Sequence, residues 1–166
     1  AEEHGILALS SNYALYADMS NRVMAILSDY SPRHEVYSID ECFVDLTGTP
    51  HLKETSYQMR ERVIAWTGIP VCVGIGPTKT LAKLANHIAK KHPRSKGVFN
   101  YNDLTSTQQD HLLSRIAVDE VWGVGRKLTV RLAEHGIYTV QDLRVAHLPT
   151  SVSYTHPEPT RQAEIS

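Results

Sequence analysis

A continuous apolar run, a glycine turn and a basic amphipathic segment follow one another between residues 69 and 91, and this succession constrains the fold most. Residues 69–75 are apolar throughout except for one glycine, which is typical of a buried strand. Gly74, Gly76 and Pro77 favour a tight turn at its end. Residues 78–91 then repeat apolar positions at helical spacing. A strand followed at once by a helix that must cover it predicts helices layered on a sheet.

The rest of the chain adds short elements of both kinds. Periodicity predicts helices over residues 14–28, 56–66, 104–116 and 127–134, two strands joined by an acidic tip within residues 35–46, and a short strand at 98–101. We therefore expect an α+β fold: a small, mostly antiparallel sheet with helices on one face over residues 1–101, then a small helical segment over residues 102–148. Residues 149–166 carry scattered prolines and no period, so we expect a disordered tail. The first residue is alanine, which suggests a fragment.

Charge is divided unevenly along the chain. Residues 1–48 hold eight acidic residues against two arginines, whereas residues 63–102 hold six lysines and arginines and no acidic residue. An acidic stretch beside a basic one suits a site that holds metal ions on one side and phosphates on the other, although a solvated lysine-rich helix face explains the basic part equally well. No apolar run is long enough for a membrane span and no signal sequence is evident, which favours the cytoplasm. Cys42 and Cys72 lie in strand-like runs and are expected to be buried thiols.

Two adjacent carboxylates, Asp40 and Glu41, stand at the tip of the predicted hairpin, preceded by Ser38. At a tight turn, neighbouring carboxylates can converge on a pair of divalent ions, which is the arrangement that two-metal phosphoryl transfer requires. Acidic residues are also common at solvated hairpin tips. Asp45, on the returning strand, is expected to be structural.

The turn after the buried strand places Lys79 at the start of a helix. Backbone N–H groups at a helix start favour a bound phosphate, and Lys79 is positioned to reach a triphosphate. A P-loop would need glycines where Val73 and Thr78 stand, so that motif is absent. Alternatively, Gly74 and Gly76 serve only a tight exit from the sheet.

A third motif contains Gly123, Gly125, Arg126 and Lys127, and a second glycine, Gly136, follows eleven residues after Gly125. This spacing resembles a helix-hairpin-helix element, whose turn offers backbone N–H groups to a DNA phosphate without reading bases. A plain packing corner between helices is the structural alternative.

Together these segments resemble Y-family translesion DNA polymerases, and most closely the UmuC type, the catalytic subunit of bacterial DNA polymerase V. The resemblance runs from about residue 5 to residue 143 and rests on Ser11-Asn12-Tyr13, Tyr16, Met19-Ser20-Asn21-Arg22-Val23, Tyr37-Ser38-Ile39-Asp40-Glu41, Gly74-Ile75-Gly76, Lys79-Thr80-Leu81-Ala82-Lys83-Leu84-Ala85-Asn86 and Val121-Trp122-Gly123-Val124-Gly125. It implies part of a palm domain over residues 1–101 and part of a thumb over residues 102–148.

The resemblance also implies roles for single residues. Asp40 and Glu41 correspond to the family's second carboxylate cluster and would hold two Mg²⁺ ions, Lys79 would contact the incoming triphosphate, and Ser38 would approach the primer or sugar. Gly123 and its neighbours in the turn would bind DNA. The family's first metal-binding aspartate and its fingers are absent from this sequence, so we expect the fragment to be inactive.

The resemblance also implies a function, namely DNA synthesis past damaged bases during an SOS response, with primer-template DNA and dNTPs as substrates. Further expected partners are a UmuD-type accessory subunit, a recombinase filament and a sliding clamp, bound mostly through absent regions. Two other functions are alternatives. A non-catalytic DNA-binding module would be indifferent to Asp40→Asn, and a P-loop hydrolase, which Val73 and Thr78 disfavour, would hydrolyse ATP. The polymerase interpretation further requires that the hairpin apex face the turn that carries Lys79.

Overall fold

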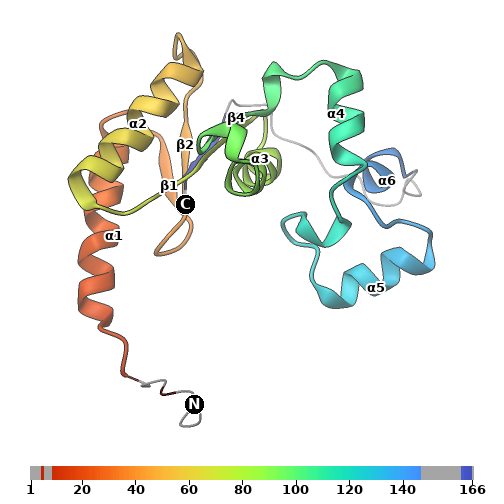
Figure 1. The fold of residues 1–166 in the computed structure, drawn as a ribbon, viewed down its shortest axis with the longest axis horizontal. Helices are drawn as coiled ribbons and strands as arrows, with labels where there is room; N and C mark the ends of the chain where they lie inside the picture. The colour runs from red at the N-terminus through yellow and green to blue at the C-terminus, as the bar shows by residue number, and fades with distance from the viewer. Residues whose placement is uncertain (1–4, 6–8, 147–161, 166) are drawn as a thin grey trace.

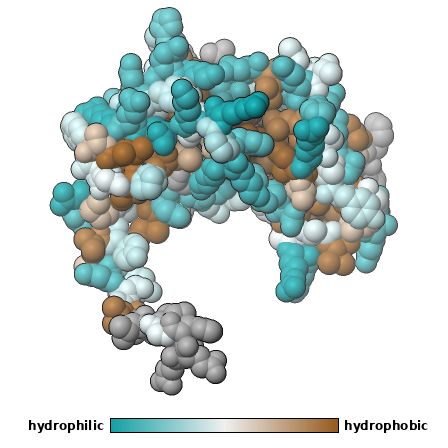
Figure 2. All heavy atoms as spheres, viewed as in Figure 1, coloured by the Kyte–Doolittle hydropathy of each residue, from teal (hydrophilic) through white to brown (hydrophobic). Residues whose placement is uncertain are grey.

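A computed structural model of the chain describes residue 5, residues 9–146 and residues 162–165. Figure 1 shows a sheet with helices beside it and a separate group of small helices, joined in an arch. The helices are α1 (Tyr13–Ser28), α2 (Leu52–Thr67), α3 (Lys79–Lys91), α4 (Ser106–Leu113), α5 (Arg126–Glu134) and α6 (Val140–Val145), and the strands are β1 (His34–Val36), β2 (Cys42–Asp45), β3 (Val73–Gly76), β4 (Val98–Asn100) and β5 (Gln162–Ile165). The space-filling view shows the same arched outline (Figure 2).

The sheet has the order β1-β2-β5-β3-β4. All neighbouring strands are antiparallel except β3 and β4, which are parallel. The β1–β2 hairpin confirms the two strands predicted around the acidic tip, and the α+β class with a mostly antiparallel sheet is confirmed as well.

Helices cover both faces of the sheet, so the expectation that they lie on one face is wrong. Val73 and Ile75 of β3 point into a core shared with α1 and α2. The intervening Gly74 and Gly76 lie against α3 on the opposite face. Because successive residues of a strand point to opposite faces, β3 carries branched side chains for one layer and none for the other. This alternation is the reason that α3 can approach the strand so closely.

The core beneath α1 and α2 is continuous and apolar. Its fully buried members include Leu27 of α1, Met59 and Val63 of α2, and Val44 of β2. Cys42 is buried in the same cluster, as predicted, and burial raises the pKa of its thiol to about 11. Cys72 is also a free thiol but is only partly buried.

The expectation of a disordered tail is wrong for residues 162–165. They form β5, which pairs with β2 on one side and β3 on the other, so it lies in the middle of the sheet. Ala163 and Ile165 are buried in the apolar core, and Glu164 is buried on the α3 face. Pairing on both edges and burial of two apolar side chains stabilise a segment whose own sequence has little strand character. The rest of the predicted tail lies outside the described residues.

The small helices pack on α3 through a second apolar cluster. Leu84 and Ile88 of α3 meet Leu113 of α4 and Val140 of α6 there. The hydroxyl of Thr139 accepts a hydrogen bond from the N–H of Asp142, whose carboxylate accepts one from the N–H of Thr139, which gives α6 a capping box. Among the described helices, none is long and apolar enough to cross a membrane.

Candidate functional site

The register of the sheet separates the hairpin apex from Lys79. Cys42 and Val73 both pair with Ile165, and Asp45 and Gly76 both pair with Gln162. The apex precedes Cys42, whereas Lys79 follows Gly76, so the two lie beyond opposite ends of the strands. Lys79 instead forms an ion pair with Glu35 of β1. The requirement that the apex face the turn that carries Lys79 is therefore not met.

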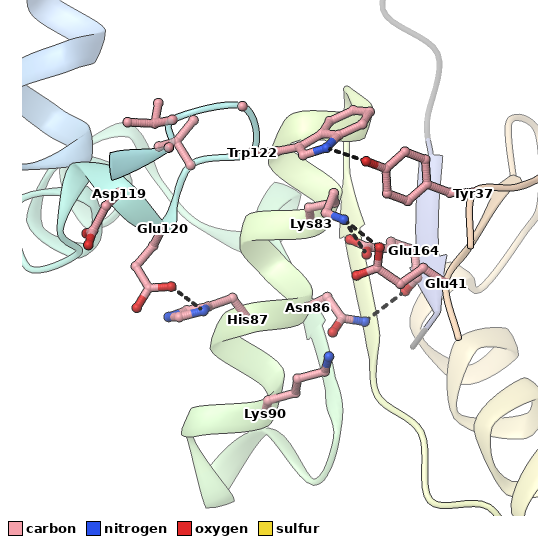
Figure 3. Close-up of a pocket in the computed structure, with 14 residues that line it drawn as sticks. Tyr37, Glu41, Lys83, Asn86, His87, Lys90, Asp119, Glu120, Trp122 and Glu164 are labelled. Carbon is pink, nitrogen blue, oxygen red and sulfur yellow. Dashed lines mark hydrogen bonds and ion pairs between the residues drawn. The ribbon is translucent and has the colours of Figure 1, made fainter. Parts of the chain in front are cut away.

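Lys83, one helical turn after Lys79, is the lysine that reaches the apex. Its Nζ lies 2.7 Å from Oε2 of Glu41 and 3.7 Å from Oε1 of Glu164 on β5 (Figure 3). The Lys83 side chain is only 18% exposed, so it is not the solvated outer-face residue that helical periodicity predicts. Burial works to lower the pKa of Lys83, but the hydrogen bond to Glu41 and the charges of Glu164 and Glu41 outweigh it and raise that pKa.

Glu164 is the most deeply buried carboxylate of this group. Burial raises its pKa to about 7, although the charge of Lys83 opposes the rise, and its Oε2 atom is buried without a hydrogen-bond partner among the described residues. An ionised carboxylate in such a position costs free energy because no donor replaces the water it has lost.

We expect the stability of the chain to fall as the pH rises from about 4.5 to about 7. The folded chain holds a proton on Glu164 in this interval, whereas the unfolded chain releases it near the ordinary pKa of 4.5. The favourable contribution of the neutral acid is complete below the unfolded pKa and is lost as the pH passes the folded pKa. Urea denaturation at pH 5 and pH 8 measures this, and Glu164→Gln should unfold at pH 8 with a free energy higher by on the order of 2 kcal/mol. Identical pH profiles for the two proteins would contradict the assignment.

The side chain of Asp40 lies apart from that of Glu41, although the Ser38 N–H donates to the Glu41 carbonyl at 3.1 Å. The Ser38 hydroxyl donates to Oδ1 of Asp40 at 2.6 Å. Asp40 lines a second cavity of about 600 Å³, whose walls include Met19, Cys72 and other largely apolar residues of α1 and the β3 approach. The adjacent carboxylates thus open into different cavities. Within the described part of the chain, no three His, Cys, Asp or Glu side chains come together as a metal site.

Aromatic side chains enclose Lys83 from the side opposite the carboxylates. The ammonium group lies 4.6 Å from the ring centroid of Tyr37 and 5.3 Å from that of Trp122. The indole N–H of Trp122 donates to the Tyr37 hydroxyl at 3.2 Å. Trp122 belongs to the segment after α4, so this contact joins the small helical group to the hairpin (Figure 3).

The predicted DNA-binding residues form a turn followed by a helix. The N–H of Val124 donates to the carbonyl of Val121 at 2.9 Å, and Gly123 has φ +90°, a conformation that favours glycine. Gly125 is the N-cap of α5 and supplies no side chain to cap its N–H groups. Arg126 and Lys127 are exposed at the start of this helix. The turn therefore presents backbone donors and two cations to solvent.

One cavity of about 630 Å³ unites these parts. Glu41, Lys83 and Glu164 line one wall, and the segment of Glu120, Trp122 and the two turn glycines lines the other. Four carboxylates line the cavity against two lysines, so a polyanion can bind there only together with cations that neutralise the carboxylates. The sequence patterns did not identify Lys83, Tyr37 and Trp122 as residues of this cavity. Only Lys83 had a recognisable signal, because it lies four residues after Lys79 on the same helix face.

Comparisons with known proteins agree on one family. The model of the impB/mucB/samB family matches residues 2–87. Protein UmuC of Salmonella typhimurium is 48% identical over 143 residues, which are 84% of this chain and 33% of the relative. DNA polymerase IV 2 of Mesorhizobium japonicum is 34% identical over 146 residues, 86% of this chain and 34% of the relative. The crystal structure of a DinB family error-prone DNA polymerase from Sulfolobus solfataricus matches with a TM-score of 0.67 at 28% identity, over 85% of this chain and 42% of that one.

The chain spans about a third of the length of these curated relatives. The family match covers more than half of its residues and includes the hairpin apex, β3 and most of α3. The resemblance found in the sequence motifs is thereby confirmed, and the requirement that the apex face the turn that carries Lys79 was wrong as a condition for the polymerase interpretation. The chain belongs to the impB/mucB/samB family of Y-family DNA polymerases.

Proposed function

We propose that this chain is the part of an error-prone translesion DNA polymerase that binds primer-template DNA and an incoming dNTP during template-directed nucleotidyl transfer. One observation carries the proposal: the cavity between the hairpin apex, α3 and the glycine turn brings Glu41 and Lys83 into one space with residues 121–125. A polymerase must hold DNA phosphates and a triphosphate side by side. The names of its relatives, which include a DNA polymerase IV, support the reaction class.

The residue roles follow the family pattern. We propose that Asp40 and Glu41 act as metal-binding and catalytic carboxylates in the whole protein, that Lys79 contacts the triphosphate, and that Ser38 approaches the sugar. Bound Mg²⁺ ions would lower the pKa of the primer 3'-hydroxyl and neutralise charge on the triphosphate. Glu41 can join such a site only by releasing Lys83, whose ammonium group now neutralises it.

The division of labour along the chain is also a proposal. Residues 1–101 would form part of the palm and residues 102–148 part of the thumb, with Gly123, Gly125, Arg126 and Lys127 on DNA. We further propose a role in SOS mutagenesis, with a UmuD-type subunit, a recombinase filament and a sliding clamp as partners of the whole protein. We further propose that the chain by itself does not polymerise.

Binding of duplex DNA tests the thumb proposal. We expect Gly125→Ala to weaken binding about tenfold without unfolding the chain, since an added Cβ meets nothing within 4 Å in the free protein but would stand between the turn and a phosphate. Lys127→Gln should lower the slope of log affinity against log salt by about one. Fluorescence anisotropy of a labelled duplex over a range of salt concentrations measures both effects.

Lys53→Gln serves as the charge-matched control, because Lys53 is an exposed lysine on α2 and pairs with Asp103 outside the cavity. If Gly125→Ala bound DNA as tightly as the unaltered chain, the turn would be a packing corner and the thumb proposal would fail.

A further inference from the structure

The side chain of Trp122 is held by the hairpin although its backbone belongs to the glycine turn. Its indole N–H donates to the Tyr37 hydroxyl at 3.2 Å. Its ring centroid lies 5.2 Å from that of Tyr37, nearly perpendicular to it, and 5.6 Å from that of Phe43. The Lys83 ammonium group lies against the same two rings, Tyr37 and Trp122. These four side chains, Tyr37, Phe43, Lys83 and Trp122, form the aromatic dock.

The same segment contacts α3 at a second point. The carboxylate of Glu120 lies 3.1 Å from Nδ1 of His87 (Figure 3). It also lies 3.0 Å from Nζ of Lys91, and both partners are on α3. Residues 120–122 therefore contact two different elements, the hairpin through Trp122 and α3 through Glu120. Val121 also packs against the second apolar cluster, and Gly123 and Gly125 follow on the C-terminal side with Val124 between them.

We propose that Trp122 is a positioning residue that fixes the phosphate-binding turn, residues 121–125, against the hairpin apex. The inference rests on the proposed function and deepens it. The side chain of Trp122 joins the turn, which would hold DNA, to the hairpin, which would hold the nucleotide, and so fixes the position of DNA relative to the nucleotide. Trp122 touches Lys83, and Lys83 touches Glu41, so the contact chain runs from the turn to the proposed catalytic carboxylate.

The dock has a measurable consequence for DNA binding. A turn held in place loses less conformational freedom when it binds a phosphate than a mobile one does. Aromatic pairs and cation–π contacts of this kind, when lost, correspond to changes of about three- to thirtyfold in an equilibrium constant. Trp122→Ala should therefore weaken duplex binding by the 166-residue chain about tenfold, and Trp122→Phe, which keeps an aromatic ring in the dock, should recover most of the loss.

A double-mutant cycle separates positioning from direct contact. Tyr37→Leu alters the hairpin, 85 residues before Trp122 in the sequence, and should by itself weaken DNA binding. If the two residues act through one dock, Tyr37→Leu combined with Trp122→Ala loses no more affinity than Trp122→Ala alone. Additive losses would show that Trp122 acts without Tyr37 and would overturn the inference.

If Trp122→Ala proves unstable, tryptophan fluorescence provides a second test of the aromatic dock. The chain has two tryptophans, so in a Trp66→Phe background the emission reports on Trp122 alone. Tyr37→Phe, which removes only the hydrogen-bond acceptor, should shift this emission if the dock exists in solution, and an unchanged spectrum would contradict it. Trp66→Ala, which removes an exposed tryptophan of α2, is the matched control and should leave DNA affinity unchanged.

Different results would contradict the proposed function and the positioning role of Trp122. If the unaltered chain binds no duplex even at low salt, the proposed function fails. If it binds duplex DNA and Trp122→Ala binds equally well, only the positioning role fails.

Discussion

Replacing Gly74 with alanine should destabilise the chain by more than about 3 kcal/mol, enough to leave much of it unfolded. A Cβ at this position would lie 2.0 Å from the backbone N of Asn86, 2.3 Å from the carbonyl oxygen of Ala82 and 2.6 Å from Cα of Asn86. All three are backbone atoms of α3, so no side-chain rotation relieves the overlap. The helix must move away from β3. Urea denaturation followed by circular dichroism measures the loss.

Displacement of α3 would also release β5 and the site. The Asn86 amide donates to the carbonyls of Cys72 at 2.9 Å and Glu164 at 3.2 Å, so the helix connects β3 and β5 across the sheet. Gly125→Ala is the matched control, because it adds the same methyl group in open space at an ordinary φ of −86°. A loss of less than about 1 kcal/mol for Gly74→Ala, close to that of the control, would mean that α3 does not pack on β3 in this way.

Local sequence patterns predicted the elements whose stability comes from their own residues. The hairpin strands and α1, α2 and α3 have clear periodicity, and their bounds differ from those predicted by a few residues. Their prediction succeeded because hydrophobic period and turn residues act over short stretches. The alternation of Gly74 and Gly76 with Val73 and Ile75 does indicate that helices pack on both faces of β3. These residues lie within a continuous apolar run, however, and the run hides the alternation.

Elements that depend on distant partners escaped prediction. The four residues of β5 carry a glutamate and a glutamine, and the strand exists because β2 and β3 pair with its two edges. Helix α6 has six residues, too few for a clear period, and is held by its capping box and by Val140 in the second apolar cluster. Nothing local to either segment contains this information.

The site shows the same division between local and distant information. Asp40, Glu41 and Lys79 were found because motifs mark them, yet the motifs gave no geometry. The sheet register sets Lys79 at one end and the apex at the other, and it is Lys83 that meets Glu41. The contact between Trp122 and Tyr37 joins residues 85 positions apart, which no pattern in a single sequence reveals.

Glu41→Gln should reduce template-directed primer extension about 10²–10³-fold in a complete polymerase that carries this segment. The amide keeps the shape of the side chain but removes the charge that a divalent ion needs, and it also ends the ion pair with Lys83. Asp40→Asn should have an effect of similar size. Suitable proteins are chimeras in which residues 9–146 replace the matching segment of the UmuC relative, and single-turnover extension of a labelled primer with Mg²⁺ and dNTPs measures the rate.

The rate of that extension reaction tests the central proposal most directly, namely that the hairpin apex is where nucleotides are joined. The proposal predicts an active chimera, extension lost with Glu41→Gln or Asp40→Asn, and full activity with Glu61→Gln, an exposed carboxylate on α2. Undiminished extension by the Glu41→Gln and Asp40→Asn chimeras would contradict it, because the apex would then be a solvated turn.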